Sequence, residues 1–205
     1  MGCKSDDFPA ESGILSGKMS FDEQFMSQYV DKLAQNVVKY LDEAGLTIAL
    51  AESCTGGLLA QSITGVSGAS KVFECGVVSY SERIKSKLLG VDPKVIETKG
   101  VVSAEVASLM AKGAAALAGA DIGVGITGIA GPSGGTKSQL VGTIYVCVCF
   151  KGQEQIKNLK LYEINKLSDT GSDSRAGALT RRQNRLAAAA YALETVIKAV
   201  AQDNG

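Results

Sequence analysis

Hydrophobic side chains between positions 21 and 41 recur at every fourth residue. They are Phe21, Phe25, Tyr29, Leu33, Val37 and Leu41. This spacing places them on one face of a helix, and Gly45 supplies the residue that ends it. Further helices are predicted after Gly57, over 81–90, from Pro93, over 104–118 and over 178–201.

Short apolar runs rich in β-branched residues alternate with these helices. We predict strands over 46–51, 72–80, 122–127 and 141–150, and the segment 156–164 alternates like an antiparallel hairpin partner of the last. Strands separated by helices pack in layers, and the hairpin adds an antiparallel pair. The chain is therefore predicted to be an α/β protein, a three-layer α/β/α sandwich with a mixed sheet.

The ends of the chain and its cysteines suggest one intracellular domain. Residues 1–18 lack the apolar core of a signal peptide, so we predict a disordered arm ahead of a single domain over 19–205. The polar stretch 165–178 is predicted to be a loop. No run approaches eighteen apolar residues, so no membrane span is expected. Five irregularly spaced cysteines are typical of reduced thiols and predict a cytoplasmic protein.

Composition removes several classes of function. The 21 basic and 21 acidic residues give a net charge of zero, which disfavours nucleic acid as a partner. The chain contains no histidine, so it cannot carry Ser-His-Asp or Cys-His catalysis or a histidine-ligated metal. We expect no metal and no cofactor. The oligomeric state stays open, a homo-oligomer included.

The first candidate for chemistry is the motif AESCTGG at 51–57. It leaves a predicted buried strand and enters a helix, so Ser53 lies beside N–H groups that have no partner within the helix. N–H groups near Thr55, Gly56 and Gly57 are thus predicted to hold an oxyanion or phosphate. The alternative is that Ser53 or Thr55 only caps the helix.

Without histidine, a serine nucleophile needs another base, and a lysine with a lowered pKa can serve. Tyr80 ends a predicted strand and Lys85 follows on the next helix, so the two could face one pocket. Lys87 would point elsewhere on that helix. The alternative for Lys85 is a solvated helix face.

Two further features suit an anionic small molecule. The glycine-rich segment TGIAGPSGG at 127–135 follows a strand, where Thr127 could offer a hydroxyl and Gly128 an N–H group, although an ordinary connection is the alternative. Residues 151–185 hold eight basic and four acidic side chains, a local charge of +4. Arg181 and Arg185 lie four residues apart, so both could reach one phosphate, unless they are ordinary surface arginines.

Together these motifs resemble one family. The motifs are AESCTGG at 51–57, VVSY with Lys85 and LLGV within 77–91, GVVS at 100–103, TGIAGPSGG at 127–135 and VGTIYV at 141–146. They stand in the order found in the C-terminal domain of CinA, the competence/damage-inducible protein. That domain also occurs alone as nicotinamide-nucleotide amidase.

The resemblance implies an enzyme that hydrolyses the carboxamide of nicotinamide mononucleotide to nicotinate mononucleotide and ammonia without a metal. It implies Ser53 as nucleophile, Lys85 with Tyr80 as the proton-transfer pair, and Thr127 at the substrate. The family's closing Gly-Asp-Arg is replaced by Leu179, Thr180 and Arg181, with Arg185 retained.

Three questions stay open at this stage. Cys54 is an alternative nucleophile, although the chain has no histidine to activate it. A catalytically weak nucleotide-binding or regulatory module of the same fold is the alternative to an enzyme. The sequence does not decide between the mononucleotide and its riboside as substrate.

Overall fold

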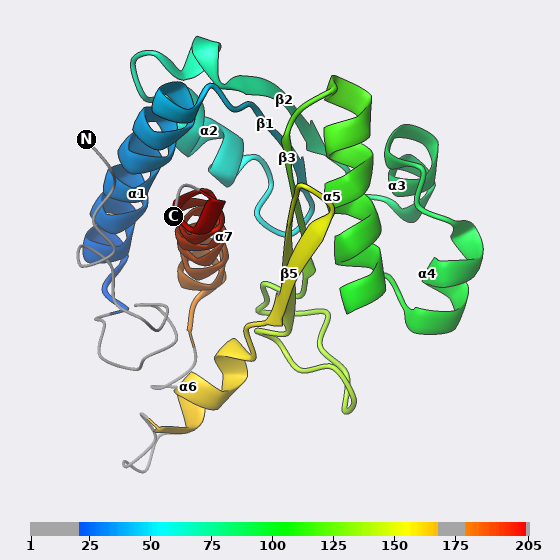
Figure 1. Ribbon diagram of the computed structural model, residues 1–205. Helices are drawn as coiled ribbons and strands as arrows, with labels where there is room; N and C mark the ends of the chain where they lie inside the picture. The colour runs from blue at the N-terminus through cyan, green and yellow to red at the C-terminus, as the bar shows by residue number, and fades with distance from the viewer. Residues whose placement is uncertain (1–20, 168–178, 204–205) are drawn as a thin grey trace.

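A computed structural model describes residues 21–167 and 179–203. At its centre is a five-stranded sheet in the order β2-β1-β3-β4-β5 (Figure 1). The strands are β1 Ile48–Glu52, β2 Phe73–Val78, β3 Ile122–Gly128, β4 Ile144–Phe150 and β5 Gln153–Asn158. β1 runs parallel to β2 and β3, whereas β4 runs antiparallel to β3 and β5, so the sheet is mixed.

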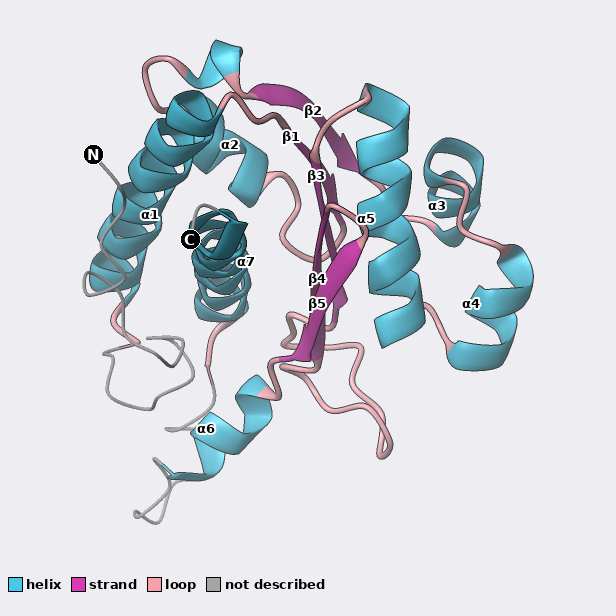
Figure 2. Ribbon diagram, in the orientation of Figure 1, coloured by secondary structure: helices cyan, strands magenta, loops and turns pink. Residues whose placement is uncertain are grey.

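Helices cover both faces of the sheet, which confirms the predicted α/β sandwich (Figure 2). One face carries α1 Glu23–Ala44, α2 Leu58–Thr64 and α7 Arg181–Asp203. The opposite face carries α3 Glu82–Leu89, α4 Pro93–Lys99 and α5 Ala104–Ala118. A 3₁₀ turn at Ala69–Lys71 precedes β2, and α6 Leu161–Leu167 follows β5.

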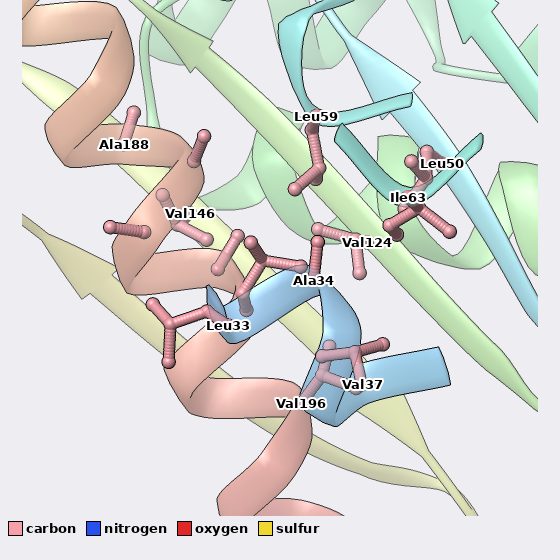
Figure 3. Close-up of a cluster of buried hydrophobic side chains, with 14 of the residues drawn as sticks. Leu33, Ala34, Val37, Leu50, Leu59, Ile63, Val124, Val146, Ala188 and Val196 are labelled. Carbon is pink, nitrogen blue, oxygen red and sulfur yellow. The ribbon is translucent and has the colours of Figure 1, made fainter. Parts of the chain in front are cut away.

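The larger part of the core lies between the sheet and the α1–α7 pair (Figure 3). Val37 of α1 and Val196 of α7 meet there with Val124 of β3 and Val146 of β4, and all four side chains are buried. Every residue of β1 is buried, as expected for a central parallel strand with helices on both faces. The central strands therefore hold their carboxyl ends in fixed positions.

On the other face, α5 packs directly on the backbone of β3. A Cβ atom at Gly123 or Gly125 would lie 2.1 Å from the carbonyl oxygen of Ala111 or Ala107 of α5. Only glycine allows this approach. The glycines of β3 therefore set how close α5 lies to the sheet.

Local signals explain where the helices begin and end. Asp22 accepts the N–H of Phe25 at 2.9 Å at the start of α1, and Ser103 accepts that of Val106 at 3.3 Å at the start of α5. Gly45, with φ of 65°, ends α1 in the left-handed conformation that the sequence predicted from its glycine.

The predicted hairpin partner 156–164 is wrong in its limits. β5 spans Gln153–Asn158, and the chain turns into α6 because Lys160 takes a left-handed φ of 47°. The Asn158 side chain stabilises that turn by accepting the Lys160 N–H at 3.1 Å. The strand predicted over 141–150 likewise begins later, at Ile144, because Gly142 has a φ of 91°.

The predicted loop 165–178 begins inside α6, and its residues 168–178 lie outside the described residues, as does the predicted arm 1–18. The helix predicted over 178–201 starts at Arg181 and ends at Asp203. Among the helices that the structure describes, none is long and apolar enough to cross a membrane.

Candidate active site

A cavity of about 320 Å³ lies at the carboxyl ends of the parallel strands β1, β2 and β3. Open α/β sheets bind their ligands at this edge. Six residues predicted from the sequence line it, namely Ser53, Tyr80, Lys85, Thr127, Gly128 and Arg181. The other four, Thr55, Gly56, Gly57 and Arg185, are not among its lining residues.

Ser53 and Lys85 are in direct contact. The Lys85 Nζ lies 3.0 Å from the Ser53 Oγ and also donates to the carbonyl oxygen of Ser79. The Lys85 side chain is completely buried, so neither contact is made in bulk water. Two residues 32 positions apart in the chain thus form one polar pair.

The helix α3 presents Lys85 to this site. Ser81 caps α3 by accepting the Ile84 N–H at 3.3 Å, which fixes the orientation of its first turn. Lys85 then faces inward, whereas Lys87 is exposed and lines a groove on the outer side of the helix. The two lysines therefore have different environments, as the helical spacing predicts.

Burial changes the proton affinity of Lys85. Removal from water lowers the pKa of its amine below the ordinary 10.5, and this outweighs the opposite influence of Cys54 and Glu82. A larger share of Lys85 is therefore neutral near pH 7 than of an exposed lysine. A neutral amine beside a serine hydroxyl can accept its proton.

Cys54 has the opposite character. Its side chain is buried, and burial raises the pKa of the thiol to about 12, so the reactive thiolate is disfavoured. The Lys85 amine makes its side-chain hydrogen bond to Ser53. Between the two neighbouring residues, the geometry favours Ser53 as nucleophile.

The turn from Ser53 to Gly57 differs from the sequence-based expectation. The Gly56 N–H donates to the Ser53 carbonyl at 3.1 Å, and the Gly57 N–H donates to the Glu52 carboxylate at 3.0 Å. These two N–H groups are already engaged within the protein. They are therefore not free to hold an oxyanion or phosphate.

The two arginines also take separate partners. Arg181 donates through NH2 to the Tyr80 hydroxyl at 2.9 Å and through NH1 to the Gly131 carbonyl at 2.7 Å. Arg185 donates through both Nε and NH2 to the Thr55 carbonyl, at 2.9 and 2.6 Å. The four-residue spacing places both arginines on one side of α7. Arg181 contacts the glycine-rich loop, however, whereas Arg185 contacts the turn before α2. The expectation that they converge on one phosphate does not match this arrangement.

Tyr80 forms part of the cavity mouth. Its side chain is 64% exposed, and its hydroxyl is bonded to Arg181 and not to Lys85. The geometry therefore separates Tyr80 from the Ser53–Lys85 pair with which the resemblance grouped it.

The third strand contributes Thr127 and Gly128. Thr127 is buried and donates its hydroxyl to the Val101 carbonyl at 2.8 Å. A Cβ at Gly128 would lie 2.8 Å from Ile144 Cα and the Thr143 carbonyl oxygen, so no larger residue fits.

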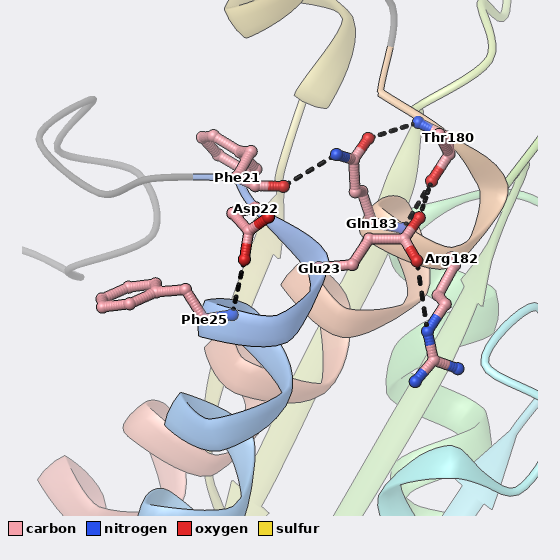
Figure 4. A network of polar contacts seen from close by, with 7 residues as sticks. All are labelled: Phe21, Asp22, Glu23, Phe25, Thr180, Arg182 and Gln183. Atoms are coloured by element: carbon pink, nitrogen blue, oxygen red, sulfur yellow. Dashed lines mark hydrogen bonds and ion pairs between the residues drawn. The ribbon is translucent and has the colours of Figure 1, made fainter.

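The start of α7, which carries both arginines, is fixed against α1 by a polar network (Figure 4). Thr180 caps α7 by accepting the Gln183 N–H at 3.1 Å and donates its hydroxyl to Glu23 at 2.8 Å. Arg182 pairs with the same Glu23 carboxylate at 3.4 Å. Thr180 stands where the resembling family has Asp, and both residue types are good N-caps. The altered motif therefore retains a helix cap ahead of Arg181.

Sequence reasoning missed Glu52, Ser79 and Asn184, which support the site from behind. Glu52 is 1% exposed and accepts three backbone N–H groups at the start of α2. Asn184 is buried and donates to the Ala130 carbonyl at 3.0 Å, which ties the glycine-rich loop to α7. A carboxylate inside an otherwise apolar strand was the available signal for Glu52. No comparable signal marks Asn184.

Within residues 21–167 and 179–203, no group of three or more His, Cys, Asp or Glu side chains is placed to hold a metal ion. The functional groups on the cavity wall are hydroxyls, the Cys54 thiol, one amine, one guanidinium and backbone amides. Such a set can perform acyl transfer with a serine nucleophile.

Comparison with known proteins gives a consistent picture. Residues 30–200 match the CinA C-terminal domain family. A competence-damage inducible protein of Moorella thermoacetica is 51% identical over 112 residues, which cover 55% of this chain and 27% of that protein. A CinA-like protein of Kosmotoga olearia is 48% identical over 131 residues, or 64% of this chain and 32% of that protein. The chain thus matches between about a quarter and a third of the length of these curated relatives.

Solved structures share the fold over most of the chain. The competence/damage inducible protein CihA of Agrobacterium tumefaciens has a TM-score of 0.73 and 33% sequence identity, covering 83% of this chain and 94% of that one. A CinA superfamily protein of Escherichia coli has a TM-score of 0.69 and 26% identity, covering 88% of this chain and 99% of that one.

Proposed function

The chain belongs to the CinA C-terminal domain family, and from that premise we propose that it is an amidohydrolase that converts nicotinamide mononucleotide to nicotinate mononucleotide and ammonia. The observation that carries the proposal is the 3.0 Å contact between a buried lysine amine, Lys85, and the Ser53 hydroxyl. Serine–lysine pairs of this kind activate a nucleophile where histidine is absent.

The first half of the reaction forms an ester on the enzyme. Ser53 Oγ attacks the carboxamide carbon while the neutral Lys85 amine takes the hydroxyl proton. The tetrahedral intermediate then breaks its C–N bond. Lys85, now an ammonium, returns the proton to the departing nitrogen, which leaves as ammonia.

The second half consumes water. Lys85, neutral again, takes a proton from a water molecule that attacks the ester carbon. The bond between Ser53 Oγ and that carbon breaks, and the proton returns to Ser53. The product acid gives its remaining proton to solvent and leaves as the carboxylate, and the enzyme is restored. No step needs a metal or a redox cofactor.

For the oxyanion, the proposed donor is the N–H group of Gly128. Beyond the antiparallel pair of β3 and β4, the Ile129 N–H donates to the Thr143 carbonyl oxygen at 2.9 Å. Because hydrogen-bonded positions alternate, the Gly128 N–H points to the other side, away from β4 and towards the end of β1. That end carries Ser53, so this N–H replaces the predicted glycine donors of the α2 turn.

The substrate's charges fit the two ends of the cavity. A pyridinium ring near Lys85 favours the neutral amine, because like charges repel. The 5′-phosphate would lie at the mouth, where Arg181 can exchange its bond to the Tyr80 hydroxyl for a stronger one to the phosphate. Arg181 is therefore the proposed phosphate ligand.

The test is ammonia release by the purified chain from nicotinamide mononucleotide, with nicotinamide riboside as a second substrate and Ser53→Ala as the blank. We expect release from the mononucleotide that the variant lacks. Nucleotide binding measured by calorimetry without ammonia release would instead support the regulatory module.

A further inference from the structure

Two oppositely charged side chains hold the turn that carries Ser53. The first is Glu52, whose Oε2 accepts the N–H groups of Gly57 at 3.0 Å and Leu59 at 3.2 Å. Its Oε1 accepts the N–H of Ala60 at 2.8 Å. This carboxylate is buried and occupies the N-terminal end of α2, where a bound anion would otherwise be expected.

The second side chain is Arg185, which reaches the same turn from α7. Its Nε and NH2 donate to the Thr55 carbonyl at 2.9 and 2.6 Å, across 130 residues of sequence. A Cβ at Gly56 would lie 3.4 Å from Arg185 NH2, so the guanidinium packs next to this residue. The φ of +62° at Gly56 favours glycine.

We propose that Glu52 and Arg185 are positioning residues that hold Ser53 Oγ within reach of the Lys85 amine. The inference rests on the proposed function only in taking Ser53 as the nucleophile. Ser53 lies in a turn beyond the end of β1, so neither the sheet nor α2 fixes it directly. A shift of about 1 Å at a reacting atom can lower a rate about 10²-fold.

This role separates Arg185 from Arg181, although both lie on the same side of α7. Arg185 is absent from the cavity lining, and two of its N–H donors already bond the Thr55 carbonyl. Its loss should therefore alter the chemical step equally for substrates with and without a phosphate. An arginine that binds the phosphate would instead change the preference for the mononucleotide over the riboside.

The kinetic test compares Arg185→Gln with Arg182→Gln. Arg182 is the matched control because it lies on the same helix and its ion pair with Glu23 is exposed, of a kind that contributes little to stability, while Thr180 keeps its own bond to that carboxylate. We expect Arg185→Gln to lower kcat about tenfold or more with KM nearly unchanged, and by the same factor on mononucleotide and riboside. Arg185→Lys, which keeps one donor and the charge, should recover part of the loss. Arg182→Gln should match wild type.

A second measurement does not depend on the natural substrate. A small sulfonyl fluoride labels an activated serine, and peptide mass spectrometry reports the rate at Ser53. We expect Arg185→Gln and Glu52→Gln to slow labelling about tenfold, with Arg182→Gln unchanged. Unfolding temperature shows whether each variant is folded, and Arg185→Lys serves as the test if Arg185→Gln is not.

Each other outcome is informative. Labelling at the wild-type rate in the folded Arg185 variant, or a loss confined to the mononucleotide, would overturn the positioning role while leaving the proposed function intact. If wild-type Ser53 is not labelled, the nucleophile assignment fails and the inference fails with it. Normal labelling without ammonia release would contradict the substrate alone.

Discussion

The floor and the mouth of the cavity are built from different kinds of contact. On the floor, Lys85 is completely buried and donates to Ser53, and Glu52, which supports the site from behind, is 1% exposed and accepts three backbone N–H groups at the start of α2. At the mouth, Tyr80 is 64% exposed and meets the exposed Arg181 through a single hydrogen bond. The first group is buried beneath the protein surface, whereas the two side chains of the second meet at that surface.

The difference assigns different tasks to the two regions. Burial on the floor lowers the pKa of an amine, which suits proton transfer. Exposure at the mouth keeps a guanidinium free to exchange a neutral partner for an anion. Changes on the floor should therefore reduce kcat, whereas changes at the mouth should raise KM.

The strongest test of the floor is Ser53→Ala. Removing the nucleophile should reduce ammonia release by about 10³-fold or more while nucleotide binding stays nearly intact. Cys54→Ala is the neighbouring control and should stay within a fewfold of wild type, because burial keeps that thiol protonated. Retention of activity within tenfold in Ser53→Ala would remove Ser53 as nucleophile.

Lys85→Met should produce the next largest effect. Loss of a general base typically costs about 10²-fold or more in kcat, and methionine fills the buried space without a charge. Lys87→Met, two residues away on the exposed face, should change kcat little. Equal losses in the two variants would mean that the contact with Ser53 does not matter for the reaction.

The pH profile tests the cause of that effect. Only the neutral amine accepts a proton, so kcat/KM should fall as pH falls through the pKa of Lys85. Because burial lowers that pKa, the rise in activity should level off below pH 10.5. Activity that keeps rising to pH 10.5 would show an unperturbed lysine and contradict the buried pair.

The sequence predicted the Ser53–Lys85 pair better than the contacts of the arginines, and the reason is physical. Strand order and helix spacing place Ser53 and Lys85 at one edge of the sheet, so their proximity follows from local pattern. The contact between Arg185 and the Thr55 carbonyl does not follow from local pattern. The four-residue spacing fixes a helix face, but the Thr55 carbonyl arrives from a turn 130 residues away.

The error at the hairpin has a similar origin. Leu159 and Leu161 are both buried, which continues the alternation of a strand through Lys160. The Asn158 side chain instead stabilises a left-handed residue, and the chain leaves the sheet there. Hydrophobic periodicity indicates which residues are buried. It does not indicate which side chains hydrogen-bond to backbone N–H and C=O groups.

At the mouth, Arg181→Ala should raise KM for the mononucleotide about tenfold, as expected for the loss of a charge-assisted hydrogen bond of about 1.5–3 kcal/mol. Turnover of the riboside, which lacks the phosphate, should change little. Added salt should narrow the gap between wild type and variant, because it screens the wild-type contact. An equal loss on both substrates would assign Arg181 to the fold or the chemistry.

The smallest effect is expected for Tyr80→Phe. This variant tests whether Tyr80 acts with Arg181 at the mouth or with Lys85 on the floor. The change removes the hydroxyl that Arg181 contacts at 2.9 Å and keeps the ring. This hydrogen bond is exposed, and in the proposed complex Arg181 exchanges it for the phosphate, so KM should change only a fewfold and kcat should stay near wild type. If Tyr80 instead shares proton transfer with Lys85, kcat should fall about 10²-fold. Steady-state kinetics on the mononucleotide separate the two results, and the exposed position of Tyr80 favours the first.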